Sequence, residues 1–371
     1  MDYQLPQAQG SLSSDGVAEL SSGFSVEDQD SNSGYQRVRE AAGYIDAGTE
    51  TYSTLIKVSG GDAVEFLDRV FPGKLSYLQP YCALSTPVLD DKIKLIDFVQ
   101  VLNLDDHFLI LGSHSQKSKL IDFLQSHQAA TEAVEICVQD EQLTSFIIEG
   151  PYAWKVAKDL VGGEVIGLRY LHAMDFELAE SKAICLRGGI TGEYGYRFIL
   201  DKNALGPLLE ELDAHPDFRP VPVSAQEIQV LAHETRIPVF GVTVMEGDCP
   251  IEMGIRYTLD FRKENYLYAE QLRNRCNEVS RSLVGFVIPG EGGEEIGQEP
   301  GTQIFFNGVP VGDFRYTSFS PMLGKQFGFA FLRNELAFPG VKQLVDPSKG
   351  RSIETTSTPF FETKSMHIVA E

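Results

Sequence analysis

The sequence has no apolar run of the roughly 20 residues that a helix needs to span a bilayer. Its first residues, MDYQLPQAQG, contain neither a basic stretch nor an apolar core, so they do not resemble a secretory signal. Cysteine is scarce, and no two of the five cysteines lie within four positions of each other. That spacing excludes a zinc or iron–sulfur clip and a disulfide framework. These absences predict a cytoplasmic protein with reduced thiols, no metal site and no membrane partner.

Positive charge is also in short supply. The chain has 31 lysines and arginines against 53 aspartates and glutamates, which gives a formal net charge of −22. Phosphate backbones and anionic membranes repel such a surface, so we expect no nucleic-acid partner. The glycine patterns that cradle nucleotides, GxGxxG and GxxxxGKS/T, are absent as well. The ligand that we expect is a small-molecule substrate.

Apolar residues make up 43% of the chain, so a sizeable core can be buried. Residues 1–33 are rich in Ser, Gly, Gln and Asp, and this composition predicts a disordered N-terminal tail. Strand and helix signals then alternate. The β-branched residues of 52–58 indicate a strand, and the spacing of Val64, Leu67 and Val70 indicates a helix on the following segment.

Two apolar segments, 95–103 and 108–111, predict a hairpin across Asp105 and Asp106. Gly and Pro cluster at 289–301, and the pattern beyond them is one of short strands and turns. We therefore expect an α+β fold that ends in a small β-barrel. The expected parts are the tail, two α+β domains and the barrel, at 1–33, 34–140, 141–279 and 280–371.

Five segments, in order, resemble the aminomethyltransferase family, which comprises the tetrahydrofolate-dependent T-protein of glycine cleavage and its relatives. They are VREAAGYIDAGTETYSTLIKVSGGDAVEFL (38–67), LIDFVQVLNLDDHFLIL (95–111), IIEGPYA (147–153), RGGITGEYGYRF (187–198) and GDFRYTSFSPMLGKQFGFAFL (312–332). The third is similar to the family's Gln-Gly-Pro-x-Ala, and the fifth to its Gly-x-Val-Thr-Ser-Gly-x-x-Ser-Pro turn. The resemblance implies a disc of three domains around a central hole that holds tetrahydrofolate as cofactor.

The fourth segment is similar to the family's Gly-Tyr-Thr-Gly-Glu-x-Gly-Tyr-Glu. Four glycines in residues 188–196 let the backbone turn sharply and approach a ligand closely. The resemblance implies that Glu193 and Tyr196 form a wall of the folate pocket. From the residues alone, a plain turn in which the glutamate caps a neighbouring strand is the alternative.

The segment AQEIQVLAHETR (225–236) matches a family helix with the pattern Arg-x-x-x-Arg-x-Glu-Ala-Gly. Glu234 stands at the family's glutamate, which implies a role in positioning the ligand. The two arginines, which contact folate in the family, are replaced by Ile228 and Ala232. Arg236 is a candidate to take over part of their role.

Asp97 lies inside an apolar strand, LIDFV, where a carboxylate must either face solvent or be paired. In the family a carboxylate on this hairpin stabilises a developing carbon cation next to the folate nitrogen. Asp97 is therefore the catalytic candidate. Gapless matching, however, places Ile96 at the family's catalytic aspartate and Asp97 at the residue after it. A bulge of one residue would restore the role to Asp97.

Arg197 stands where the family has a glutamate that binds the pterin. A pterin presents two donors, N3–H and the 2-amino group, which a carboxylate accepts, whereas a guanidinium offers only donors. If Arg197 faces the hole, it suits a carboxylate, phosphate or carbonyl ligand. The alternative is an outward-facing arginine paired with the acidic surface. With Ile96, Ile190 and Ala232, this change indicates a remodelled pocket.

These observations predict a tetrahydrofolate-dependent one-carbon transferase that moves a methylene (aminomethyl) or methyl group in a remodelled pocket. The first alternative is a repurposed enzyme of the same fold that acts on an anionic, non-folate metabolite. The second is a non-catalytic folate-binding protein, but the Lys-Gly-Cys-Tyr motif of that family branch is missing from RKENYLYAEQ (262–271). The negative charge also argues against docking an acidic lipoyl carrier protein.

Overall fold

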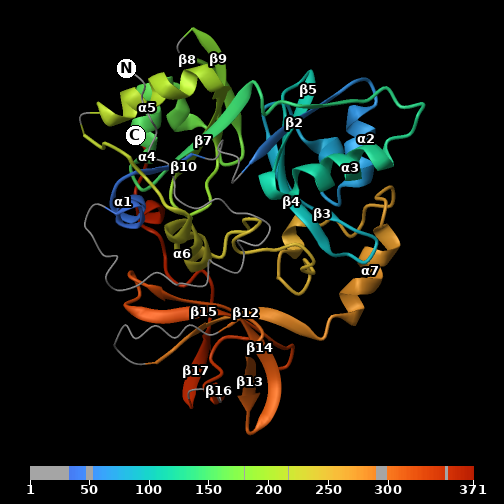
Figure 1. Ribbon diagram of the computed structural model, residues 1–371, viewed down its shortest axis with the longest axis vertical. Helices are drawn as coiled ribbons and strands as arrows, with labels where there is room; N and C mark the ends of the chain where they lie inside the picture. The colour runs from blue at the N-terminus through green and yellow to red at the C-terminus, as the bar shows by residue number, and fades with distance from the viewer. Residues whose placement is uncertain (1–32, 47–52, 179, 216, 290–298, 347–349) are drawn as a thin grey trace.

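The computed structural model describes residues 33–46, 53–178, 180–215, 217–289, 299–346 and 350–371. Figure 1 shows three lobes arranged as a triangle, two built on open sheets and one on a barrel. The fold is therefore α+β with a closed C-terminal barrel, as the sequence predicts. The predicted disordered tail lies outside the described residues, apart from Ser33. No described helix is both long and apolar enough to cross a membrane.

The first lobe contains sheet A, whose six strands run in the order β11-β1-β7-β10-β9-β8. The strands are β1 (Gly43–Ile45), β7 (Leu143–Glu149), β8 (Ala173–Leu178), β9 (Ser181–Arg187), β10 (Gly195–Asp201) and β11 (Val221–Pro222). The helices are α1 (Gly34–Glu40), α4 (Ala153–Val161), α5 (Leu205–Asp213) and α6 (Ala225–Thr235). Helices α4 and α5 bury their apolar sides against one face of the sheet. The other face, which we call the inner face, is turned towards the second lobe and α6.

The second lobe contains sheet B, with the strand order β3-β4-β5-β2-β6. The strands are β2 (Thr54–Ser59), β3 (Ala83–Leu89), β4 (Leu95–Asn103), β5 (His107–Gly112) and β6 (Glu135–Val138). The helices are α2 (Ala63–Val70), α3 (Lys117–His127) and α7 (Ala269–Glu278). Helices α2 and α3 cover one face of sheet B, because their apolar residues share a core with Val99 and Val101. The predicted helix after the first strand and the predicted hairpin are both confirmed.

The two sheets meet through an apolar cluster that takes residues from both, among them Leu102 of β4 and Ile199 of β10. Backbone hydrogen bonds from Ala83 to Leu171 and from Ala173 to Tyr81 join them at one edge. Strand β1 precedes sheet B in the sequence but pairs with β7 of sheet A. Sheet A is therefore built from segments on both sides of sheet B in the sequence. The expected domain boundary between residues 140 and 141 stays a prediction.

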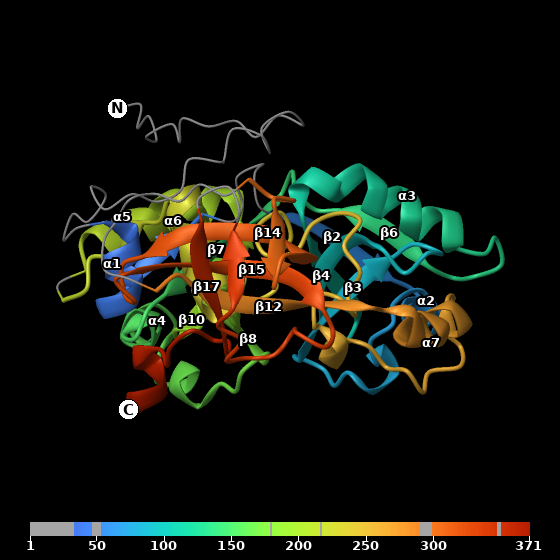
Figure 2. The same ribbon diagram turned by 90° about the horizontal axis from the view of Figure 1, so that it is seen from below.

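The third lobe is a six-stranded closed barrel, in the order β12-β15-β14-β13-β16-β17. Its strands are β12 (Arg281–Val287), β13 (Gln303–Phe306), β14 (Val309–Ser320), β15 (Lys325–Arg333), β16 (Leu344–Asp346) and β17 (Arg351–Thr356). Phe286, Phe314 and Leu332 fill its interior. Figure 2, which views the molecule from below, has the barrel strands in front of the two sheet lobes. Helix α6 links barrel and sheet A, since Leu231 packs with Phe327 of β15.

A close backbone approach in the barrel gives a first prediction. A Cβ atom on Gly328 would lie 2.0 Å from the carbonyl oxygen of Tyr316 on the neighbouring strand. Gly328→Ala should therefore force the strands apart and lower the free energy of unfolding by ~1–3 kcal/mol, as overpacking does. Gly61→Ala is the control, because no atom lies within 4 Å of its added Cβ. Urea unfolding of both variants measures the difference, and equal midpoints would contradict this packing.

Candidate functional site

A buried charge cluster joins helix α1 to two of the candidate residues. The Arg39 guanidinium donates to Glu193 Oε1 at 3.2 Å and to Glu234 Oε2 at 2.8 Å from Nη2 and 3.2 Å from Nε. It also donates to the carbonyl oxygens of Thr191 and Leu231. These bonds engage all five N–H donors of the arginine. Both carboxylate side chains are completely buried, so neither Glu193 nor Glu234 is turned towards a ligand.

The remaining oxygens of the two carboxylates are also engaged. Glu234 Oε1 accepts from the hydroxyl groups of Tyr35 and Ser320, each at 2.6 Å. Glu193 Oε2 accepts from the backbone N–H and the hydroxyl group of Ser365. Burial lowers the pKa of Arg39, but Glu234, Tyr35 and Glu193 more than offset this effect, so the pKa is raised. Arg39 therefore stays charged, and its cluster connects α1, the glycine turn, α6, the barrel and the C-terminal segment.

A second buried carboxylate, Glu149 at the end of β7, holds the glycine turn in place. Its Oε1 accepts from the backbone N–H of Ile190 at 2.7 Å. Its Oε2 accepts from the backbone N–H and the hydroxyl group of Thr191. A Cβ on Gly189 would lie 2.7 Å from Glu149 Oε2, so glycine is required there. Glu149 is not among the predicted site residues, although it stands at the glutamine of the family's Gln-Gly-Pro-x-Ala.

Neighbouring residues of β10 face opposite sides of sheet A. Tyr196 lies in the core under α4 with no exposed surface, and its hydroxyl group has no hydrogen-bond partner among the described residues. Arg197 is half-buried on the inner face and donates from Nη1 to Ser145 Oγ at 3.1 Å. Burial lowers the pKa of Arg197 to about 10, although the nearby Glu149 charge raises it. The predicted pocket wall at Tyr196 is thus inside the lobe, whereas Arg197 faces the region between the lobes.

Asp97 is also placed away from the inner face. Strand β4 has a register shift at Ile96, since Val88 pairs with Asp97 and Leu89 with Leu95. This one-residue bulge does not turn Asp97 inwards. Its carboxylate accepts from the backbone N–H of Ser113 at 2.9 Å. A Cβ atom on Gly112 would lie 3.0 Å from this carboxylate and 2.5 Å from the side chain of Leu120 on α3, so Asp97 and Leu120 are on the same side of the sheet. Asp97 is fully buried on the α3 side of the sheet, so this placement does not support the predicted catalytic role.

Apolar residues occupy the positions of the two family arginines. Ile228 and Ala232 of α6 are buried in a cluster with Ile45, Ile147 and Val242, against which Ile190 also packs. Ile147 pairs with Arg197 on the neighbouring strand. The guanidinium of Arg197 is therefore bordered by hydrocarbon where the resemblance implies two more cationic groups.

Arg236 ends helix α6 in the left-handed conformation, with φ of 57°. It donates from Nη2 to the carbonyl oxygens of Met253 and Leu283, at 3.0 and 3.2 Å, and from Nη1 to Thr358 Oγ1. Burial is the main cause that lowers its pKa. Arg236 thus connects α6 to the barrel. Among the described residues, it shares no hydrogen-bond partner with Arg197.

Two exposed tyrosines, Tyr170 and Tyr257, interact electrostatically with residues of this region. Tyr170 and Tyr257 are 62% and 75% exposed, yet burial by surrounding protein raises the pKa of both. Glu149 further raises the pKa of Tyr170, while Tyr257 is influenced by Tyr170 and Arg236. Tyr257 therefore lies near both Tyr170 and Arg236, and Tyr170 lies near Glu149. Within the described residues, no three His, Cys, Asp or Glu side chains are arranged to hold a metal ion.

Comparisons with known proteins agree with this architecture. Residues 13–263 match the model of the GCVT N-terminal domain, and residues 281–362 match that of the glycine cleavage T-protein C-terminal barrel domain. The chain therefore belongs to the aminomethyltransferase family of glycine cleavage T-proteins.

Individual relatives are distant but similar over most of their length. The aminomethyltransferase of Bacillus subtilis (strain 168) is 26% identical over 337 residues, covering 88% of this chain and 90% of the relative. The probable aminomethyltransferase of Thermococcus gammatolerans is 25% identical, covering 82% and 83%. The crystal structure of the glycine cleavage system aminomethyltransferase T from Bartonella henselae superposes with a TM-score of 0.75, covering 89% of each chain at 19% identity. This last likeness bears on the fold alone.

The charge cluster gives a second prediction. Arg39→Met removes the cation and leaves two buried carboxylates without compensation, which should cost ~3–5 kcal/mol in the free energy of unfolding. Arg219→Met is the control, because its ion pair with Asp213 has side chains that are 69% and 81% exposed. That change should cost less than ~1 kcal/mol. Urea unfolding tests both, and an Arg39 effect as small as that of Arg219 would refute the role given to the cluster.

Asp97 gives a third prediction, about pH. Burial raises the pKa of the Asp97 carboxyl to about 6. Between pH ~4 and ~6 the folded protein holds this proton while the unfolded chain has released it, so the stability that Asp97 contributes falls as the pH rises. At ~1.4 kcal/mol per pKa unit, the contribution of Asp97 to the free energy of unfolding should fall by ~3 kcal/mol over this range. Asp97→Asn should remove that share of the pH dependence. If thermal and urea unfolding of the two proteins keep the same pH dependence, the buried placement is contradicted.

Proposed function

We propose that this protein is a one-carbon transferase that uses tetrahydrofolate in a pocket remodelled around Arg197. The single observation that carries the proposal is the position of residue 197. The turn held by Glu149 presents this residue on the inner face of sheet A, bordered by the two apolar clusters of the inner face. Membership of the aminomethyltransferase family supports the reaction class.

The residues around position 197 do not fit a pterin in the pose that the resemblance implies. The N3–H and 2-amino groups would meet the N–H groups of Arg197, so donors would oppose donors. A pterin turned so that its carbonyl oxygen faces Arg197 gives the guanidinium an acceptor. In that pose Ser145 orients the arginine through its hydrogen bond to Nη1.

In this proposal Asp97 does not touch the substrate or the folate. Its carboxylate is enclosed on the α3 side of sheet B, where it caps the backbone at Ser113. Glu193 and Glu234 act through Arg39, since their oxygens are fully engaged inside the protein. Their part is to hold the glycine turn and α6 in position.

A second candidate function is a repurposed enzyme that binds an anionic, non-folate metabolite. The observation that favours it is the half-buried guanidinium of Arg197, whose hydrogen-bond partner within the described part of the chain is Ser145 alone. A desolvated arginine with donors to spare binds planar carboxylates well. Here the folate of the family would be replaced by a small organic acid.

A fourth prediction distinguishes the two candidate functions by comparing the unchanged protein with the variants Arg197→Gln and Arg197→Glu. If tetrahydrofolate is the ligand, calorimetry should detect it with the unchanged protein, and Arg197→Glu should bind it about tenfold more weakly, because a carboxylate cannot donate to the pterin carbonyl oxygen. Glutamine, which offers both a donor and an acceptor, should lie between. Circular dichroism of each variant confirms that it is folded.

The absence of tetrahydrofolate binding at high micromolar concentration would refute the folate proposal. If, in addition, a thermal-shift screen finds stabilisation by small carboxylates that is lost in Arg197→Glu, the second candidate is supported. A ligand profile that is unchanged by Arg197→Glu would count against both.

A further inference from the structure

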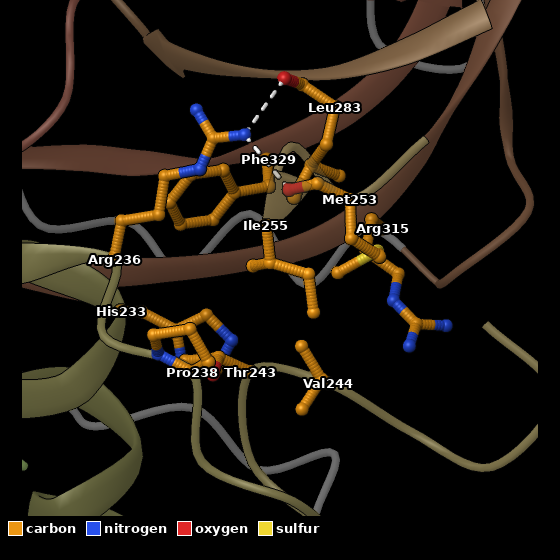
Figure 3. A pocket seen from close by; sticks show the side chains of 10 residues that line it. All are labelled: His233, Arg236, Pro238, Thr243, Val244, Met253, Ile255, Leu283, Arg315 and Phe329. Carbon is orange, nitrogen blue, oxygen red and sulfur yellow. Dashed lines mark hydrogen bonds between the residues drawn. The ribbon is translucent and has the colours of Figure 1, made fainter. Parts of the chain in front are cut away.

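The segment that follows the last barrel strand starts from a firm support at the end of α6. Arg236 lies beside a small hollow between α6 and the barrel, where its guanidinium donates to two backbone carbonyl oxygens (Figure 3). Its Nη1 donates to Thr358 Oγ1 at 3.1 Å. Two residues further on, the backbone N–H of Phe360 donates to the carbonyl oxygen of Glu234 at 3.0 Å. The chain is therefore fixed to α6 and the barrel up to this point.

Residues 363–371, which we call the strap, run from this support across the glycine turn to helix α4. Figures 1 and 2 both place the end of the chain beside α4. The strap buries little apolar surface, because its 3₁₀ helix η8 (Lys364–His367) contains no buried residue, and Met366 and Val369 are 65% and 73% exposed. Segments with few buried apolar contacts open locally while the rest of a protein stays folded.

Hydrogen bonds to the glycine turn hold the strap in place. The hydroxyl group of Thr363 donates to the carbonyl oxygen of Gly192 at 2.8 Å. The hydroxyl group of Ser365 donates to Glu193 Oε2 at 2.6 Å and accepts from the backbone N–H of Tyr194 at 2.8 Å. The backbone N–H of Ser365 donates to the same Glu193 oxygen at 2.9 Å. Each of these three turn residues is thus bonded to the strap.

The two halves of the glycine turn have different supports. Glu149, inside sheet A, holds the first half, since it accepts from two backbone N–H groups there. In the second half, Arg39 engages Glu193 Oε1, whereas Glu193 Oε2 accepts from Ser365 alone among the described residues. If the strap leaves, this oxygen and the N–H of Tyr194 are open to water. The second half of the turn then loses a support, while the first half keeps its own.

We propose that the strap is a latch, which opens and closes as one unit with the second half of the glycine turn, and that a ligand bound at Arg197 keeps it closed. The ligand part of this inference rests on the proposed function. Arg197 is three positions beyond Tyr194, on the strand into which the turn leads. Because linkage is reciprocal, ligand binding and strap closure stabilise each other.

Hydrogen–deuterium exchange of the full chain without ligand tests the latch. Peptides that cover 190–196 and 362–368 should show similar protection, although they are far apart in the sequence. Ser365→Ala removes a donor and an acceptor, so the exchange of both peptides should become about tenfold faster. Ser365→Thr keeps the hydroxyl group and should restore the original rates. Met366→Ala, at an exposed side chain of the strap, is the matched control and should change neither peptide.

Faster exchange at 362–368 alone would overturn the latch, because the turn would then be held without the strap. Unchanged exchange of both peptides in Ser365→Ala would overturn it as well. So would an equal acceleration in the barrel peptide 281–287, since the contact would then belong to the global fold. If Ser365→Ala does not fold, Tyr194→Phe supplies the same comparison, because it removes the 2.7 Å hydrogen bond from the tyrosine hydroxyl group to the carbonyl oxygen of Ile368.

The coupling to the ligand is tested with tetrahydrofolate, whose Kd is first measured by calorimetry. At about ten times this Kd, exchange at 362–368 should be about tenfold slower, because the ligand must leave before the strap opens. The same slowing should appear in Ser365→Ala, on its faster rate. Exchange that bound tetrahydrofolate does not slow would overturn the coupling. If calorimetry finds no binding, the proposed function fails together with the ligand part, whereas exchange without ligand still decides the latch.

Discussion

The arrangement of this protein depends on the pairing of one buried arginine, Arg39, with two buried carboxylates. Glu193 comes from the glycine turn and Glu234 from helix α6, and neither side chain is exposed. Tyr35, Ser320 and Ser365 bring α1, the barrel and the C-terminal segment to the same point. Buried charges are costly unless they are paired and hydrogen-bonded. A shift of the barrel against the first lobe would break part of this hydrogen-bonded cluster, so the cluster fixes how these two lobes meet.

This constraint gives Glu193 and Glu234 a structural role that does not depend on the ligand. Glu193 and Glu234 are needed to hold the backbone, whatever the ligand is. Arg197, Ile228 and Ala232 are not part of the cluster and face the inner side of sheet A. In the function that we propose, these positions present a single guanidinium bordered by hydrocarbon where the resemblance implies a glutamate and two arginines. The fold is retained because its central ion pairs lie elsewhere.

Much of the fold could be predicted from the sequence, because helix spacing, the hairpin and the ordered family motifs are local signals. The positions of individual side chains could not. Glu193 and Glu234 pair through Arg39, which is more than 150 positions away in the sequence. Alternation along β10 shows that Tyr196 and Arg197 face opposite ways, but not which one faces the core. The orientation of Asp97 depends on the bulge at Ile96 and on helix α3, and neither is encoded in the pentapeptide around it.

The central claim is that Arg197, on the inner face of sheet A, is the group that recognises the ligand. A crystal structure of the protein soaked with tetrahydrofolate tests this claim most directly. The account predicts a pterin next to β10, with its carbonyl oxygen within hydrogen-bond distance of the Arg197 guanidinium, and with Glu193 still bonded to Arg39. A pterin held by Glu193 or Glu234, or one bound far from Arg197, would contradict it.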